Sequence, residues 1–191
     1  MADIPLHHFI YGTCQDYLTG EELVDTDDER VRQDLARLLV EEKGYAKEHL
    51  EPRLKIETLF AKQFVVSKID LVVKIDGRRL LMIRYGPGSL VTRERSVIAA
   101  ARVLDPEQRI PLAVITNGKD AEFLDTLTGT VLGHGMAAIP WREDLEAMAN
   151  FLDFSPYPEQ KRERELRILN AYDVQVCCAG SPCALPKAPE G

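Results

Sequence analysis

The chain has 191 residues, of which 45% are hydrophobic and 29% are charged, and this composition is typical of one globular domain. No apolar run approaches the roughly 20 residues that span a bilayer, and residues 1–12 lack the basic start and apolar stretch of a secretory signal peptide. We therefore expect a cytoplasmic protein without a membrane partner.

The formal net charge of −7 argues at first against a nucleic-acid partner, but the charge is unevenly distributed. Residues 53–119 carry 13 basic and 6 acidic side chains, whereas residues 1–52 carry 5 basic and 13 acidic ones. This basic third indicates either a face for a phosphate backbone or an ordinary solvated surface.

The first half of the chain predicts a helix followed by strands. Residues 1–25 show no period and are expected to form an irregular leader. Thr26 followed by Glu29 has the form of a capping box and predicts a helix over 27–43, with Gly44 as its stop. Residues 45–52 are expected to form a connector that ends at Pro52.

A β-hairpin is predicted next. Alternating apolar residues predict a strand over 54–58. Two apolar runs, 65–73 and 79–84, then flank Asp76-Gly77, a dipeptide that favours a tight hairpin turn.

The second half alternates helices and strands. We expect helices over 92–104, 142–152 and 159–171, a buried strand over 110–116, and a small hairpin around Thr128-Gly129. The fold class is therefore α/β, with a mixed sheet flanked by helices. The expected divisions are a domain over 1–153 that includes the leader, a helical extension over 154–172, and a Cys/Pro/Gly-rich tail over 173–191.

Several stretches resemble a known family when they are taken together and in order. They read DYLTGEEL, DERVRQDLARLLVEEKGY, KIDLVVKIDGRRLLMI, RYGPG and VITNGKDAEFLDTLTG. In this order they resemble the N-terminal nuclease domain of the type I restriction enzyme R subunit, a branch of the PD-(D/E)XK superfamily, over roughly residues 10–150. The resemblance implies a restriction-endonuclease-like fold, duplex DNA as a partner, and cleavage with Mg²⁺.

The family's site has an Asp in the first hairpin strand and Glu-x-Lys in the second, and the two carboxylates hold the metal. Asp70 falls where the first acid belongs, but Ile83 and Tyr85 replace the Glu and the Lys. A register moved by one residue gives Met82 and Arg84, which restores no carboxylate. The resemblance therefore implies a degenerate site that retains Asp70 as a remnant and a doubtful Mg²⁺ ligand.

A relocated acid is the alternative, because some members of the superfamily take a carboxylate from a neighbouring helix. Glu94 and Glu29 are the candidates, although both also suit the N-terminal dipole of a helix. Lys68 and Lys74 share the face of Asp70 by strand parity, and either could act as the cation or neutralise Asp70.

Two further groups of residues are candidates for ligands. Arg84, Arg93 and Arg95, in and after the second hairpin strand, are the candidates for DNA contact. Cys14, Cys177, Cys178 and Cys183 match in number the one early and three late ligands of the iron–sulfur clusters in some related nucleases, and zinc held with His7 or His8 is a second option. Adjacent cysteines and an unusual spacing favour uninvolved thiols.

Three classes of function remain open from the sequence. The first is a nuclease fold that has lost cleavage and binds DNA or other protein subunits. The second is an active Mg²⁺-dependent deoxyribonuclease that uses Glu94 or Glu29, and the third is a domain without a nucleic-acid partner.

Overall fold

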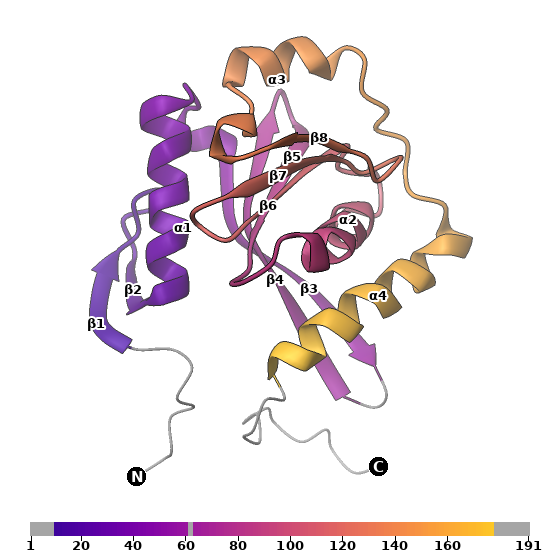
Figure 1. The fold of residues 1–191 in the computed structure, drawn as a ribbon, viewed down its shortest axis with the longest axis horizontal. Helices are drawn as coiled ribbons and strands as arrows, with labels where there is room; N and C mark the ends of the chain where they lie inside the picture. The colour runs from indigo at the N-terminus through magenta and orange to yellow at the C-terminus, as the bar shows by residue number, and fades with distance from the viewer. Residues whose placement is uncertain (1–9, 61–62, 178–191) are drawn as a thin grey trace.

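A six-stranded mixed sheet flanked by helices forms the centre of the molecule in a computed structural model, which describes residues 10–60 and 63–177 (Figure 1). The strand order is β3-β4-β5-β6-β7-β8, and a separate two-stranded sheet pairs β1 with β2. The strands are β1 (Ile10–Gln15), β2 (Glu22–Thr26), β3 (Leu50–Phe60), β4 (Gln63–Ile75), β5 (Arg78–Tyr85), β6 (Leu112–Thr116), β7 (Ala121–Asp125) and β8 (Val131–His134). The helices are α1 (Asp27–Arg37), α2 (Glu94–Val103), α3 (Arg142–Ala149) and α4 (Glu159–Cys177). This confirms the expected α/β class and is consistent with a restriction-endonuclease-like fold.

The expectation of an irregular leader is wrong for residues 10–25, which belong to the β1–β2 hairpin, and residues 1–9 lie outside the described chain. A two-stranded sheet is marginal on its own, and this one is held by contacts with α1 that leave no period in the sequence. The Tyr11 hydroxyl donates to Asp27 at 2.9 Å, and the Arg30 guanidinium lies 3.7 Å from the centre of the Tyr11 ring.

Helix α1 begins as its sequence predicts, with the Thr26 hydroxyl accepting from the Glu29 amide at 3.2 Å. The Glu29 side chain turns instead toward Arg32 and Gln33. The last turn of the predicted helix is a π-helix over Leu38–Glu42, and Gly44 follows with a φ of +79°.

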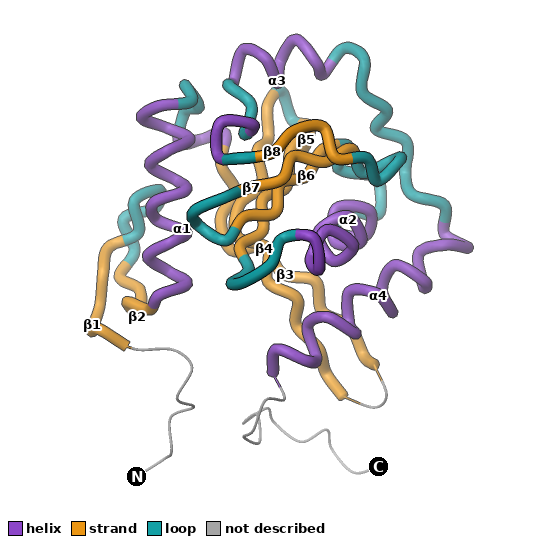
Figure 2. The backbone as a smooth tube through the Cα atoms, in the orientation of Figure 1, coloured by secondary structure: helices purple, strands orange, loops and turns teal. Residues whose placement is uncertain are grey.

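The central hairpin forms as predicted, and its Asp76-Gly77 turn has positive φ at both residues, 50° and 77°. Strand β3 runs through Pro52, because an edge strand tolerates a missing donor. Strand β5 pairs with β4 only over residues 71–75, so the outer half of the β3–β4 hairpin extends past the rest of the sheet (Figure 2).

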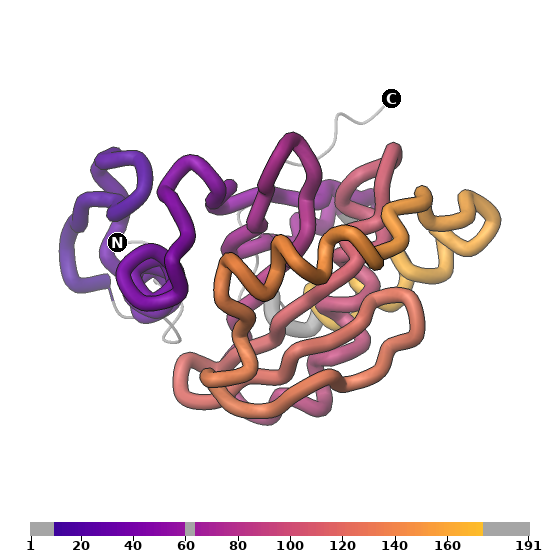
Figure 3. Tube along the Cα trace, turned by 90° about the horizontal axis from the view of Figure 1, so that it is seen from above, coloured from indigo at the N-terminus to yellow at the C-terminus, as the bar shows by residue number. Residues whose placement is uncertain are grey.

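Strand β6 runs parallel to β5 and is buried along its whole length, as expected of a strand covered on both faces. One face of the sheet packs on α1 and α3, with Leu35 of α1 among the core side chains and Leu38 beside them. The other face packs on α2 and α4, where Leu169 is fully buried. Both views place α1 and α4 at opposite ends of the molecule (Figures 1 and 3).

Helix α4 continues to Cys177, six residues past its expected end at Ala171. It lies along α2, and its residue Asp173 forms an ion pair with Arg84 of β5 at 3.0 Å. This long-range pair lies beyond the predicted end of the helix. The predicted divisions at 153 and 172 stay predictions, and residues 178–191 lie outside the described chain.

Candidate functional site

Asp70 lies where the β4–β5 ladder ends. The last paired residues are Leu71 and Ile83, and beyond them the Tyr85 amide donates to the Asp70 carboxylate at 2.7 Å. Arg32 of α1 donates to the other carboxylate oxygen through Nη2 at 2.8 Å and Nε at 3.2 Å. Asp70 is only 5% exposed, so its charge is compensated inside the protein and not by water.

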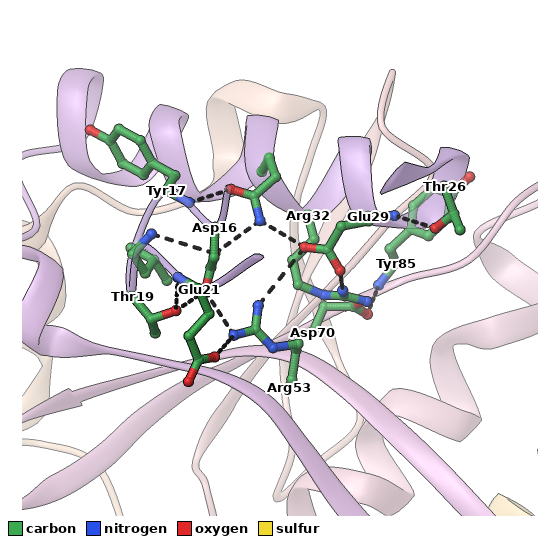
Figure 4. Close-up of polar contacts among 12 residues, drawn as sticks. Asp16, Tyr17, Thr19, Glu21, Thr26, Glu29, Arg32, Arg53, Asp70 and Tyr85 are labelled. Carbon is green, nitrogen blue, oxygen red and sulfur yellow. Dashed lines mark hydrogen bonds and ion pairs between the residues drawn. The ribbon is translucent and has the colours of Figure 1, made fainter. Parts of the chain in front are cut away.

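The same arginine binds Glu29, one helical turn earlier on α1. Arg32 Nη1 forms a close ion pair with Glu29 Oε2, and both side chains are buried. The structure therefore brings Glu29 and Asp70, two of the predicted acids, to a single guanidinium (Figure 4). Sequence reasoning did not identify Arg32 as a site residue. Its position three residues after Glu29 was the available signal, because residues at this spacing share one face of a helix.

A second layer of polar contacts surrounds this pair. Gln33 donates to Glu29 at 2.7 Å and to Asp16 at 2.9 Å, and Arg53 of β3 donates to Asp16 at 2.7 Å. Arg53 also lies 3.9 Å from Glu29, and its backbone has a φ of +56°, which is rare for a residue other than glycine. Although burial opposes its ionisation, hydrogen bonds from Arg53, Gln33 and Thr19 hold the pKa of Asp16 well below its ordinary value.

The two residues that replace the expected Glu-x-Lys cannot act as a metal ligand or as a catalytic cation. Ile83 is fully buried in the core between Leu71 and Val114 of the neighbouring strands. Tyr85 is half-buried, and burial together with the charges of Asp28, Asp27 and Asp70 raises its pKa, so the phenol carries no charge at neutral pH. Neither residue supplies an oxygen anion or a cation to Asp70.

The residues present do not fit Mg²⁺. The ion takes oxygen ligands in a near-octahedral arrangement and keeps several waters. Here the Asp70 and Glu29 carboxylates are already bound by Arg32, Gln33 and the Tyr85 amide. Among the residues that the structure describes, no group of three or more His, Cys, Asp or Glu side chains is placed to hold a metal ion.

The other candidate catalytic residues lie elsewhere. Glu94 begins α2 and contacts Glu122 of β7; burial and then the charge of Glu94 raise the pKa of Glu122. Lys68 is exposed, and Lys74 lies 3.6 Å from Glu51. Strand parity is therefore a poor guide here, because the cation at Asp70 comes from a helix above the sheet.

Two of the three candidate DNA-contacting arginines take part in internal contacts. Arg84 donates to Ser96 at 2.7 Å and to Asp173 at 3.0 Å, and its side chain is 11% exposed. Arg95 is more exposed and lies 3.9 Å from Glu165. Arg93 lies against Gly86, where a Cβ atom would meet its side chain at 2.6 Å.

The structure describes only part of the cysteine set. Cys14 is a free, half-buried thiol on β1, and burial raises its pKa. Cys177 is the last residue of α4, while Cys178, Cys183, His7 and His8 lie outside the described residues. The expectation of uninvolved thiols therefore stays a prediction.

Comparison with known proteins identifies one family. Residues 27–140, more than half of the chain, match the model of the type I restriction enzyme R protein N terminus. No curated protein and no solved structure matches the chain. Over the described residues, no helix combines the length and the apolar character needed to cross a membrane. On the family match, the chain belongs to the type I restriction enzyme R protein N-terminal family.

Proposed function

We propose that this chain is a nuclease-like domain that does not cleave DNA and that serves as an assembly module in a restriction-type complex. One observation carries the proposal: the Arg32 guanidinium lies between two buried acids, Asp70 at the position of the family's first acid and Glu29 on α1. An arginine is never deprotonated in a protein, so it is a permanent internal counter-charge for both acids.

The geometry explains why a divalent ion would compete poorly for these acids. A metal would have to displace a guanidinium that is held by Glu29 and by two hydrogen bonds to Asp70. The displaced cation would then be buried without a partner, which is costly. Ile83→Glu would restore the family's second acid only by placing a carboxylate in the apolar core, so we expect that variant to lose stability.

The distribution of charge favours assembly over tight DNA binding. The basic third of the sequence folds against the acidic flanks, so much of its positive charge is neutralised internally. The pairs that join the basic third to a flank include Arg53–Asp16, Arg79–Glu51, Arg84–Asp173, Arg102–Glu165 and Arg109–Asp153. Arg93 remains the best candidate for a DNA contact, and a single arginine gives only a weak, salt-sensitive one.

A second candidate function has its own observation. Glu29 and Asp70 converge on one guanidinium, so a nuclease that used Glu29 as its relocated acid would already have two carboxylates close together. Glu94 has no such support, because it contacts Glu122. In the assembly module Arg32 stays between the two acids, whereas in the nuclease it would have to move away to free them for a metal ion.

Plasmid nicking in Mg²⁺ and in Mn²⁺ tests the proposal. We expect no nicking by the unmodified chain at micromolar concentration, and the same result for Asp70→Asn. Nicking by the unmodified chain that Asp70→Asn abolishes would overturn the proposal. In that case Glu29→Gln and Glu94→Gln identify the second acid, with Glu163→Gln on the exposed surface of α4 as the matched control.

A further inference from the structure

The outer half of the β3–β4 hairpin has an open strand edge. Strand β3 is the first strand of the sheet, and β4 is its only partner in the six-stranded order. Within the described part of the chain, the only backbone hydrogen bond of residues 50–60 outside the regular strand pairing is from the Leu50 amide to the Lys47 carbonyl, at the inner end of β3. An edge of this kind is a template for another strand.

The charges on this edge are not balanced within one copy. Lys55 of β3 is directly opposite Lys68 of β4, and both side chains are exposed. Like charges in directly opposite positions destabilise a strand pair. Glu57, two residues further along β3 and also exposed, is opposite Val66.

We propose that β3 pairs in antiparallel fashion with β3 of a second copy of this chain, about a two-fold axis through Ile56. In this register Lys55 of each copy is opposite Glu57 of the other, and Leu54 is opposite Thr58. Each edge lysine thus gains an acidic neighbour across the new strand boundary, next to its unfavourable Lys68 neighbour. The charge pattern of the edge is self-complementary, so the partner that it fits is a second copy.

Symmetry leaves few other registers. Side chains in directly opposite positions of an antiparallel pair lie on the same face, so an axis perpendicular to the sheet must pass through a residue and not between two. An axis through Lys55 would bring two lysines together, and an axis through Glu57 would bring two glutamates together. Ile56 is the remaining choice in this charged segment, and it matches every charge with an opposite one.

The shape of β3 sets the length of the new pairing. Arg53 has a φ of +56° and Pro52 has no donor, so the regular edge begins at Leu54. Helix α4 contacts the opposite face of the hairpin, where Thr58 donates to Asn170 at 2.6 Å. The face of Lys55 and Glu57 carries exposed apolar side chains as well, with Leu59 72% and Phe64 56% exposed. Their partial burial would add to the pairing.

Charge reversal tests both the partner and the register. Sedimentation equilibrium over micromolar to millimolar concentrations should show a reversible monomer–dimer equilibrium for the unmodified chain. Lys55→Glu makes the edge acidic on both copies, and Glu57→Lys makes it basic on both. Each single variant should weaken the dimer roughly tenfold.

Two recombinations must then restore association. An equimolar mixture of Lys55→Glu and Glu57→Lys should form the mixed dimer, and the Lys55→Glu/Glu57→Lys double variant should dimerise like the unmodified chain. Circular dichroism checks that each variant is folded, and Glu163→Lys on α4 is the matched surface control. A monomer at all concentrations, a dimer unaffected by the single reversals, or no mixed dimer would each overturn the proposal. None of these outcomes bears on cleavage.

Discussion

The two faces of the central sheet both bury arginines against carboxylates, but with different consequences. On the α1 face, Arg32 binds Glu29 and Asp70, and the Tyr85 amide and Gln33 complete the hydrogen bonding of the two acids. On the α2–α4 face, Arg102 binds Glu165 at 3.1 Å and also donates to the Thr126 and Leu127 carbonyls.

The difference lies in which oxygens remain without a donor. Among the described residues, Glu165 Oε2 and Asp173 Oδ2, both on the α4 face, are buried without a hydrogen bond. No carboxylate oxygen of Asp70 or Glu29 is buried without one. Asp70 and Glu29 are therefore the more completely hydrogen-bonded acids, although Arg53 Nη1 beside them is buried without a hydrogen bond. Asp70 is therefore not a free ligand, and its contact with an internal cation is the feature to test.

Removal of Arg32 should have the largest effect. Arg32→Ala leaves the buried Asp70 carboxylate without its cation and Glu29 with only Arg53 at 3.9 Å, and loss of one partner of a buried pair costs about 3–5 kcal/mol in the free energy of unfolding. Urea unfolding measures this loss. Arg32→Met with Glu29→Gln and Asp70→Asn removes all three charges and should recover most of the stability.

The same variant tests whether the Arg32 guanidinium occupies the place of a metal ion. If Arg32 occupies the place of a cation, Arg32→Ala should be stabilised by millimolar Mg²⁺, and the unmodified chain should not be. A loss below about 1 kcal/mol for Arg32→Ala would contradict this view of Arg32, because the acids would then not depend on the guanidinium.

Loss of the Arg102–Glu165 pair should have an intermediate effect. Glu165→Ala removes the contacts with Arg102 and with the Tyr157 hydroxyl, and we expect a loss of about 2–3 kcal/mol. Limited proteolysis should show earlier cutting within α4. The exposed Arg167–Glu163 pair on the same helix is the control, since Arg167→Ala should change stability by less than about 0.5 kcal/mol. Equal losses of stability in Glu165→Ala and Arg167→Ala would contradict the idea that the buried Arg102–Glu165 pair holds α4 against α2.

The smallest expected effect is at Glu122, whose pKa is raised by burial and by Glu94. A raised pKa in the folded state means that this carboxyl stabilises the fold below its unfolded value near 4.5 and that the contribution is lost as pH rises through the folded value. Glu122→Gln keeps the neutral form at all pH values, so it should be more stable than the unmodified chain at pH 7 by at most about 1 kcal/mol. The difference should vanish near pH 4, and a difference independent of pH would contradict this assignment.

Most of the sheet and its helices could be predicted because their signals are local. The Asp76-Gly77 turn, the Thr26 cap and the continuous apolar run of β6 each fix an element from a few neighbouring residues. The β1–β2 hairpin could not be found in this way, because its stability comes from contacts such as Tyr11 with Asp27 on α1.

Only the acids of the site could be predicted, because the cation between them comes from a part of the sequence distant from Asp70. Family resemblance pointed to Asp70 and Glu29, and both lie at the site. The cation between them is 38 positions before Asp70 in the sequence, and strand parity considered only lysines on the same strand. Arg84 was proposed to contact DNA because it lies in the basic third, and its internal partner Asp173, 89 positions away, could not be foreseen. A list of charges gives no information on which opposite charges the fold brings together.

The side chain of Arg53 links parts of the protein that are otherwise separate. It joins the edge strand β3 to the loop between β1 and β2 through Asp16 and Glu21, and to α1 through Glu29. A two-stranded sheet is marginal alone, so we expect the amide protons of the β1–β2 hairpin to exchange with solvent when its contacts with α1 and with Arg53 open. The N-terminal hairpin and the start of α1 should therefore open together, and Arg53, a residue in a left-handed conformation, is one of the contacts that hold them.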